Sequence, residues 1–251
     1  MTELHPHQPL GPFVGGRQVD GTGSVDVRDP YDDALVATVQ TGDAAMVRRA
    51  VADAAAHLPP APASQRARVL ATAAAMVEAD AEHFARTVCA EAGKPITQAR
   101  GEVARCVETL RFSSAEALTM TGEMVPMDAS AYGAGKVGML VRRPIGVVGA
   151  ISPFNFPLNL VAHKLAPAIA AGCPVVLKPA SATPLSALLL ARVLTDAGLA
   201  PGALAVVPGS SGDVGATIVG HPDVPMISFT GSGPVGWGIA RDQPAKRVAL
   251  E

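Results

Sequence analysis

The second half of the chain alternates short apolar runs with longer amphipathic ones. Strand-like runs lie at 147–151, 175–177, 204–207 and 227–229, helix-like runs lie at 158–171, 184–197, 213–219 and 235–241, and a fifth strand begins at 247. Nearly continuous apolar strands that alternate with helices indicate a parallel sheet covered on both faces, with right-handed crossovers. We therefore predict an α/β fold with a doubly wound, Rossmann-like parallel sheet. This architecture does not by itself identify a ligand.

The first 121 residues are predicted to form an arm followed by Ala-rich helices that flank the sheet. β-prone pieces at 25–30 and 33–40 indicate a leading hairpin or arm, and a last helix spans about 96–118. Candidate boundaries of the other helices, in chain order, are Asp43 (N-cap), His57 (end), Ser64 (start), Asp80 (break) and Gly93 (stop).

Residues 122–145 are predicted to form a projecting hairpin. Two β-prone runs, GEMVPMD and VGMLVRRP, flank the glycine-containing segment ASAYGAGK. The predicted organisation is therefore an arm and helical part at 1–121, a hairpin at 122–145 and the Rossmann-like core at 146–251.

The composition of the chain argues against nucleic acid and membranes as binding partners. The chain has 251 residues, 49% of them hydrophobic and 17% charged, with a formal net charge of −2. This balance gives no electrostatic basis for binding nucleic acid or an anionic membrane. No apolar run reaches the roughly 20 residues of a membrane span, and the polar, proline-rich start does not resemble a signal peptide. We expect a cytoplasmic protein with neither partner.

The cysteines and the first histidines do not indicate a metal site. Cys89, Cys106 and Cys173 lie far apart without CxxC spacing, which argues against a disulfide framework or a zinc site. His5 and His7 lie beside prolines and are too few to make a ligand set on their own. We interpret the thiols as core residues and the two histidines as part of a mobile tail.

Two polar residues follow the first two strands of the core. Asn155 lies between Pro153 and Pro157, which restrict the backbone on either side. Its carboxamide can donate to an oxygen that becomes negative during a reaction, or it can bond loop backbone groups, and the local pattern leaves both roles open. Lys178 ends the next strand, where it either contacts ribose or phosphate oxygens or simply meets water. The strand-end position favours ligand contact.

A glycine-rich turn and the last residue add candidate chemistry. The segment 229–236 joins a strand to a helix, and its three glycines let a pyrophosphate approach the free amides of the helix start. The alternative is an ordinary glycine turn. Glu251 follows an apolar run, and a carboxylate in an apolar cleft can act as a general base. Without further context, a terminal glutamate is more often a solvated side chain.

Taken together, PFNFPLNLVAHKLAPAIAAGCPVVLKPAS, LAPGALAVVPG, ISFTGSGPVGW and KRVALE strongly resemble the NAD(P)-dependent aldehyde dehydrogenase superfamily, from about Asp29 to the end. The resemblance implies that Asn155 stabilises an oxyanion and that Glu251 activates the water that hydrolyses a thioester. It also implies that Lys178 binds the cofactor ribose and that the 122–145 hairpin builds a homodimer or homotetramer. The residues implied to bind NAD or NADP are Ile151, Ser152, Pro153, Phe154, Lys178, Pro179, Ala180, Ser181, Phe229, Thr230, Gly231, Ser232 and Val235.

The sequence departs from the family pattern in two places. Ser181 stands where many NAD-preferring members carry a ribose-binding glutamate, so NADP should be tolerated and the preference stays open. The family's nucleophilic cysteine belongs to a separate catalytic domain a few dozen residues beyond the Glu251 position, and that domain is absent from this sequence. We therefore expect this polypeptide to be the amino-terminal, cofactor-binding part of such an enzyme, inactive by itself.

The substrate implied by the resemblance is a short polar or anionic aldehyde. His163 matches a helix position that lines the substrate tunnel, and Arg111 lies on a helix that resembles the other tunnel wall. The motifs are most similar to the lactaldehyde and phosphonoacetaldehyde branch. Either residue could instead face solvent or a structural carboxylate. The competing interpretation of the whole chain is a non-catalytic nucleotide-binding or oligomer-forming module derived from the same family.

Overall fold

The computed structural model describes residues 10–251 and is built around one seven-stranded sheet. The strand order is β11-β10-β7-β8-β9-β1-β2. The parallel strands are β7 (Val148–Ile151), β8 (Val175–Lys178), β9 (Leu204–Val206), β10 (Met226–Phe229) and β11 (Arg247–Leu250). Each lies within a residue or two of its predicted run, so the predicted Rossmann-like parallel sheet is confirmed. The antiparallel pair β1 (Phe13–Val14) and β2 (Arg17–Gln18) extends the sheet beyond β9.

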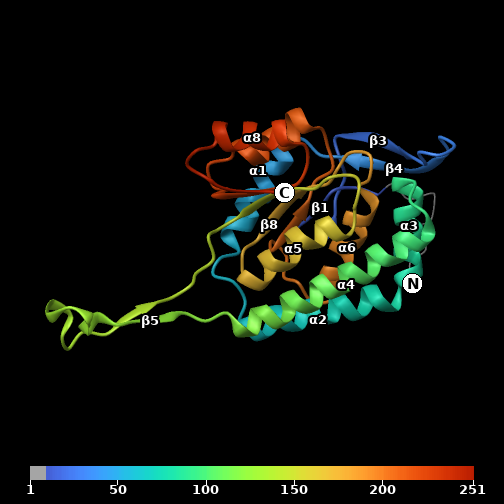
Figure 1. The fold of residues 1–251 in the computed structure, drawn as a ribbon. Helices are drawn as coiled ribbons and strands as arrows, with labels where there is room; N and C mark the ends of the chain where they lie inside the picture. Colours follow the sequence, from blue (N-terminus) through green and yellow to red (C-terminus); the bar gives the residue numbers. More distant parts are fainter. Residues whose placement is uncertain (1–9) are drawn as a thin grey trace.

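Helices cover both faces of this sheet (Figure 1). One face carries α1 (Ala44–Ala56), α7 (Ala216–Gly220) and α8 (Gly233–Asp242). The other carries α5 (Asn159–Ala171) and α6 (Leu185–Asp196), over which α2 (Ala63–Ala79), α3 (Ala81–Ala92) and α4 (Ile96–Thr119) form an outer layer. Successive residues of β8 alternate between the two resulting cores: Val175 and Leu177 pack in one, and Val176 packs in the other. This alternation explains why the strand is apolar throughout.

Local capping rules locate most helix ends correctly. The Asp43 carboxylate accepts a hydrogen bond of 2.8 Å from Met46 N at the start of α1, and Gly93 ends α3 in the left-handed region with φ of 64°. Asp80 separates α2 from α3 as predicted. The prediction for Ser64 is wrong by one residue: α2 begins at Ala63, because Pro62 takes the N-cap position without any side-chain cap.

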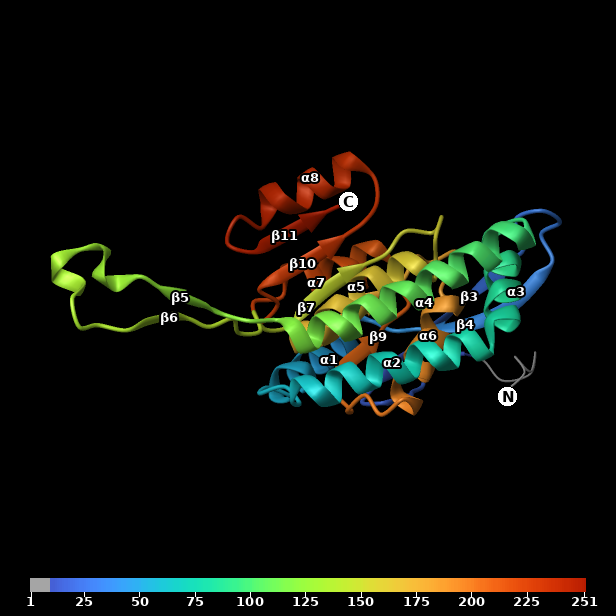
Figure 2. The same ribbon diagram turned by 60° about the horizontal axis from the view of Figure 1, so that its bottom comes forward.

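Both predicted hairpins are present. β3 (Gly23–Arg28) pairs with β4 (Leu35–Thr41) near the outer helices, and β5 (Glu123–Val125) pairs with β6 (Gly138–Leu140). The β5–β6 hairpin extends far from the body, with two short 3-10 turns, η1 (Met127–Ala129) and η2 (Ala131–Gly133), at its tip (Figure 2). Its exposed apolar side chains include Met124, Val125, Met139 and Leu140.

The described residues contain neither a membrane-spanning helix nor a cluster of metal-binding side chains. Within residues 10–251, no helix combines the length and apolar character needed to cross a membrane. The same residues contain no group of three or more His, Cys, Asp or Glu side chains that could hold a metal ion. His5 and His7 lie outside the described residues.

Candidate functional site

Strand register brings the predicted site segments to one edge of the sheet. Ile151 pairs with both Lys178 and Phe229, and Phe229 pairs with Leu250, so four neighbouring strands end at the same level. Because these strands are parallel, the segments that follow them emerge on one side. The Asn155 loop, Lys178, the Gly231 turn and Glu251 therefore lie along one edge.

Within residues 10–251, the Lys178 ammonium is buried at this edge without an acidic partner. Lys178 is only 3% exposed, and its Nζ donates to Pro179 O at 3.1 Å. Among the described residues, no carboxylate lies within salt-bridge distance of it, and burial lowers the pKa of Lys178. The hydroxyl of Ser181, in the loop that follows, donates to Gly209 O at 3.1 Å. A buried cation with spare donors fits a polar or anionic ligand.

The turn between β10 and α8 leaves room for a ligand at the helix start. Ser232 is the N-cap of α8 but makes no capping bond with its side chain, and a Cβ on Gly233 would meet nothing within 4 Å. A Cβ on Gly231 would lie 2.6 Å from the Phe229 ring, so a larger residue would force the ring or the turn to shift. Open space in front of uncapped helix N–H groups suits a diphosphate.

A buried lysine that sequence reasoning missed connects this turn to Glu251. Lys164, on α5, is 4% exposed and donates to Thr230 Oγ1 at 2.6 Å and to Ser228 Oγ at 3.3 Å. Thr230 Oγ1 in turn donates to Glu251 Oε2 at 2.9 Å. Burial lowers the pKa of Lys164 to about 8, against the opposing effect of the Glu251 carboxylate. Lys164 lies in an apolar helical run, where periodicity alone does not show what its ammonium contacts.

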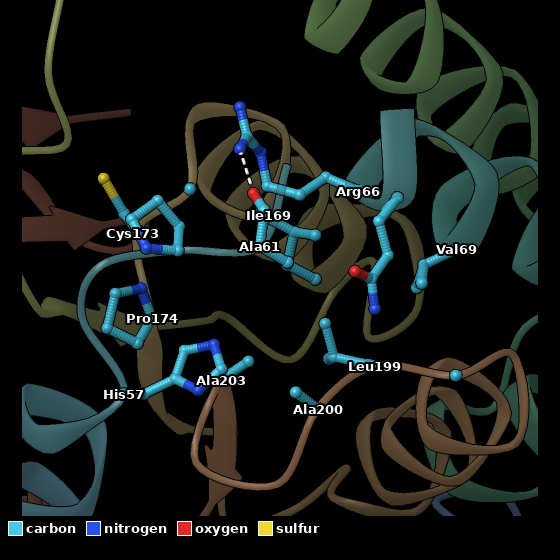
Figure 3. A pocket seen from close by; sticks show the side chains of 14 residues that line it. His57, Ala61, Arg66, Val69, Ile169, Cys173, Pro174, Leu199, Ala200 and Ala203 are labelled. Carbon is cyan, nitrogen blue, oxygen red and sulfur yellow. Dashed lines mark hydrogen bonds between the residues drawn. The ribbon is translucent and has the colours of Figure 1, made fainter. Parts of the chain in front are cut away.

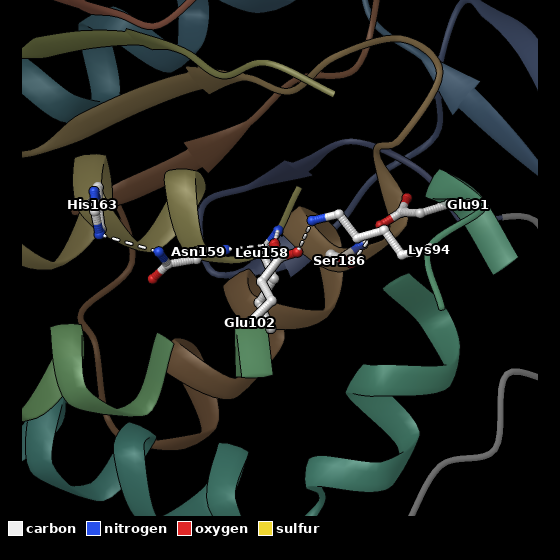
Figure 4. A network of polar contacts seen from close by, with 7 residues as sticks. All are labelled: Glu91, Lys94, Glu102, Leu158, Asn159, His163 and Ser186. Atoms are coloured by element: carbon white, nitrogen blue, oxygen red, sulfur yellow. Dashed lines mark hydrogen bonds and ion pairs between the residues drawn. The ribbon is translucent and has the colours of Figure 1, made fainter. Parts of the chain in front are cut away.

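The Asn155 loop is anchored on both sides of the asparagine. Upstream, Ser152 N donates to Lys178 O at 3.2 Å. Downstream, the backbone N–H groups of Leu158 and Asn159 donate to the buried Glu102 carboxylate at 2.9 and 3.1 Å (Figure 4). Asn155 itself is exposed at the site edge.

A second buried glutamate serves α6 in the same way. Glu91 accepts hydrogen bonds from Leu185 N at 2.7 Å, from Ser186 N at 3.0 Å and from the Ser186 hydroxyl (Figure 4). Glu91 and Glu102 thus each occupy the N-terminus of a helix that follows a strand of the site. Sequence reasoning found neither, because a glutamate beside an apolar stripe looks like a surface residue.

The structure does not bring Arg111 and His163 together. His163 borders an open cleft of about 780 Å³ that lies beside the amino end of β10 and the base of the β5–β6 hairpin, and Asn159 Nδ2 lies 3.3 Å from His163 Nε2. The Arg111 guanidinium instead binds Glu78 at 2.7 Å and Glu108 at 3.1 Å, in a separate hollow bordered by α2, α3 and α4. In this arrangement Arg111 meets one carboxylate of α2 and one of its own helix, which is the alternative left open by the sequence, and its place on the tunnel wall stays a prediction.

The three thiols lie in the helices and at the opposite edge of the sheet. Cys106 is buried in α4 and Cys89 is half-buried in α3, and burial raises the pKa of both. Cys173 precedes β8, where it borders a small hollow lined also by His57 and Arg66 (Figure 3). That cavity of about 30 Å³ is far too small for a dinucleotide. These placements agree with the interpretation of the cysteines as core residues.

Comparison with known proteins supplies the family. Residues 18–251 match the model of the aldehyde dehydrogenase family. The chain is 43% identical to aspartate-semialdehyde dehydrogenase 1 of Pseudomonas canavaninivorans, over 90% of this chain and 49% of that protein. It is 38% identical to 3-sulfolactaldehyde dehydrogenase of Priestia aryabhattai, over 100% of this chain and 53% of that protein.

Solved structures agree with the fold. Aldehyde dehydrogenase 21 of Physcomitrella patens, in complex with the reaction product succinate, superposes with a TM-score of 0.93 at 39% identity, over 97% of this chain and 52% of that chain. The NAD+ complex of an aldehyde dehydrogenase from Bacillus cereus gives a TM-score of 0.92 at 29% identity, over 98% and 51%. The chain thus spans about half the length of the relatives that it matches. Its sequence and fold together show that it belongs to the aldehyde dehydrogenase family.

Proposed function

We propose that residues 1–251 form the cofactor-binding part of an NAD(P)+-dependent aldehyde dehydrogenase that oxidises a short, anionic or polar aldehyde to its carboxylate. The observation that carries this proposal is the convergence of the Asn155 loop, Lys178, the Gly231 turn and Glu251 at one sheet edge. Ligands of open parallel sheets bind beyond the carboxyl ends of the strands.

The cofactor half of the site would use Lys178 and the turn before α8. The Lys178 ammonium would donate to ribose hydroxyls, and the free amides around Ser232 and Gly233 would bind the diphosphate. The NAD+ complex of the Bacillus cereus relative supports a nicotinamide cofactor for this fold. Ser181 neither repels a 2′-phosphate nor chelates the ribose diol, so both NAD and NADP are proposed.

The chemical half would use Asn155 and Glu251. Asn155 Nδ2 would donate to the oxygen of the tetrahedral adduct that forms when a thiol attacks the aldehyde. The bound nicotinamide supplies the hydride acceptor. Glu251, held by the Thr230 hydroxyl, would take a proton from the water that hydrolyses the thioester. The attacking thiol belongs to the complete enzyme and would be a cysteine outside residues 1–251.

A cationic cleft supports the anionic class of substrate. The cleft that His163 borders follows α5 to the amino ends of β7, β10 and β11. It is also lined by Arg66, Arg142, Arg143, Lys164 and Arg247, of which Arg142 pairs with Glu123 at 3.7 Å, and no carboxylate is among its lining residues within the described chain. Carboxylate- or sulfonate-bearing aldehydes would be attracted to such a surface. The names of two relatives, an aspartate-semialdehyde dehydrogenase and a 3-sulfolactaldehyde dehydrogenase, point to the same class.

Assembly and location follow from the same family argument. The exposed apolar strands of the β5–β6 hairpin would pair with another subunit, giving a homodimer or homotetramer. A cytoplasmic location stays part of the proposal.

Calorimetric titration with NAD+ and with NADP+ tests the cofactor site. We expect Lys178→Met to weaken binding by about tenfold or more, because each hydrogen bond to a charged group contributes about 1.5–3 kcal/mol. Lys136→Met, at an exposed position of the hairpin, is the matched control and should bind like wild type. Equal affinities for wild type and Lys178→Met would remove Lys178 from the site.

An assay of aldehyde oxidation then distinguishes the proposed enzyme from the alternative, a non-catalytic module. A longer polypeptide that contains this chain and a nucleophilic cysteine should oxidise short acidic aldehydes, and Asn155→Ala should reduce kcat by about a hundredfold. Cofactor binding with no aldehyde oxidation would favour the non-catalytic module.

A further inference from the structure

The ion pair between Lys94 and Glu102 holds the segment that follows Asn155 at three points. Lys94 Nζ binds Glu102 Oε2 at 2.5 Å and also lies 3.5 Å from the centroid of the Phe156 ring, which is a cation–π contact. Glu102 Oε1 accepts the N–H groups of Leu158 and Asn159. One ion pair therefore contacts both the Phe156 side chain, next to Asn155, and the backbone amides at the start of α5.

The other contacts of this segment lie at its downstream end, where Leu160 N donates to Phe156 O at 3.1 Å and the Leu158 side chain is buried in the core. Leu158, at the N-cap position of α5, offers no capping side chain, so the Glu102 carboxylate takes the place of a cap. Asn155 and Phe154 are exposed, and Phe154 keeps 66% of its surface accessible. Upstream of Asn155, the nearest backbone hydrogen bond is the one that Ser152 N, three residues earlier, donates to Lys178 O. The direction of the Asn155 side chain thus depends mainly on its downstream neighbours.

Burial of both charges makes the Lys94–Glu102 ion pair costly to break. Glu102 is 1% exposed and Lys94 has a side-chain exposure of 14%, so both charges are largely removed from water. Breaking a buried pair leaves an uncompensated charge, which is strongly unfavourable. Arg105, whose guanidinium lies 5.6 Å from the Phe156 ring, adds a second cation on the same aromatic side chain.

We propose that Lys94 and Glu102 are positioning residues that fix the orientation of the Asn155 carboxamide through Phe156 and the first turn of α5. The inference rests on the proposed role of Asn155 as the oxyanion donor, and it deepens that role by naming what aims the donor. A catalytic donor that is displaced by about 1 Å loses about a hundredfold in rate, so an anchor of this kind has a functional consequence beyond stability.

Glu91 provides a matched control inside the same chain. It is also a buried glutamate, and it also receives two backbone amides at a helix N-terminus, but it serves α6. Glu91→Gln therefore perturbs an equivalent buried acceptor of helix amides, but at a helix that does not follow Asn155. A general loss of stability would appear in both variants, whereas a loss of Asn155 order would appear only in variants of the Lys94–Glu102 pair.

The sequence offers a direct probe, because Asn155 and Asn159 are the chain's two asparagines. Selective nitrogen-15 labelling of asparagine therefore labels two backbone amides and two side-chain NH2 groups, whose signals an Asn155→Ser spectrum assigns. In Glu102→Gln and Lys94→Met, we expect the heteronuclear NOE of both Asn155 amides to fall. In Glu102→Gln, the Asn159 amide proton should also move upfield, since its acceptor becomes neutral. Lys94→Arg should restore the Asn155 signals, and Glu91→Gln should leave them unchanged.

An unchanged Asn155 NOE in both Glu102→Gln and Lys94→Met would overturn the proposal. Because this measurement needs neither cofactor nor activity, it is independent of the proposed function. In the complete enzyme, we then expect Glu102→Gln to lower kcat by about tenfold or more with unchanged cofactor affinity. If Asn155 loses order while kcat stays at the wild-type value, the proposed role of Asn155 is wrong and the positioning inference stands.

Discussion

The carboxyl group of Glu91 should make the stability of the protein depend on pH. Glu91 is 1% exposed, and burial raises its pKa from the usual 4.5 to about 7. The hydrogen bonds from Ser186 and Leu185 lower this pKa, and the charge of Glu102 raises it further. The folded protein then holds this proton more tightly than the unfolded chain. Its free energy of unfolding must therefore fall as the pH rises from about 4.5 to about 7.

The size of this effect follows from the difference between about 7 and 4.5. At about 1.4 kcal/mol for each pH unit, the full difference corresponds to about 3 kcal/mol, of which about 2–3 kcal/mol falls between pH 5 and 8. Glu91→Gln removes the titrating group. The variant should be less stable than wild type at pH 5, because its amide nitrogen would face a backbone N–H, but this contribution to the pH slope should disappear.

Urea unfolding followed by far-UV circular dichroism at pH 5, 6, 7 and 8 measures both slopes. Glu116→Gln, at an exposed position of α4, is the control and should keep the wild-type slope. If wild type and Glu91→Gln lose stability equally between pH 5 and 8, the Glu91 carboxyl does not titrate in this range and the reasoning fails.

Three further predictions concern other parts of the molecule. Burial lowers the pKa of Lys164 from 10.5 to about 8. The unfolding free energy of wild type should therefore rise as the pH increases from about 8 to 10.5, and this rise should be absent in Lys164→Met. The control Lys136→Met should show the same rise as wild type. Gly231→Ala places a methyl carbon 2.6 Å from the Phe229 ring and should cost about 1–3 kcal/mol, seen as a lower Tm, while Gly233→Ala meets open space and should cost less. Met139→Glu on the β5–β6 hairpin should lower the mass measured by light scattering in the assembled protein, and the exposed Tyr31→Glu should not. An unchanged Tm in Gly231→Ala or an unchanged mass in Met139→Glu would contradict these two arguments.

The features that local chemistry determines could be predicted from the sequence. The parallel strands are apolar on both faces, and that pattern predicts a buried sheet without any knowledge of neighbours. Asp43 and Gly93 obey capping rules that involve three or four residues. Asn155 and Lys178 could be placed at strand ends because the end of an apolar run is visible in the sequence. The two-residue strands β1 and β2 are too short to show any periodicity.

Contacts between distant helices could not be predicted in this way. Glu102 meets Leu158 across 56 positions, and Glu91 meets Leu185 across 94. Periodicity predicts that α4 is a helix, but it does not predict that Glu78, 33 positions away, binds the Arg111 guanidinium. Lys164 shows the same limit, since its hydroxyl partners belong to β10 and the turn after it.

A crystal structure of the protein with NAD+ bound would test the central claim most directly. We expect the diphosphate to lie against Gly231 and the start of α8, and a ribose to lie within hydrogen-bond distance of Lys178 Nζ. We also expect the nicotinamide to approach Asn155 and Glu251. A dinucleotide bound at the amino ends of the strands, or away from Lys178, would contradict the convergence of these groups on one cofactor site.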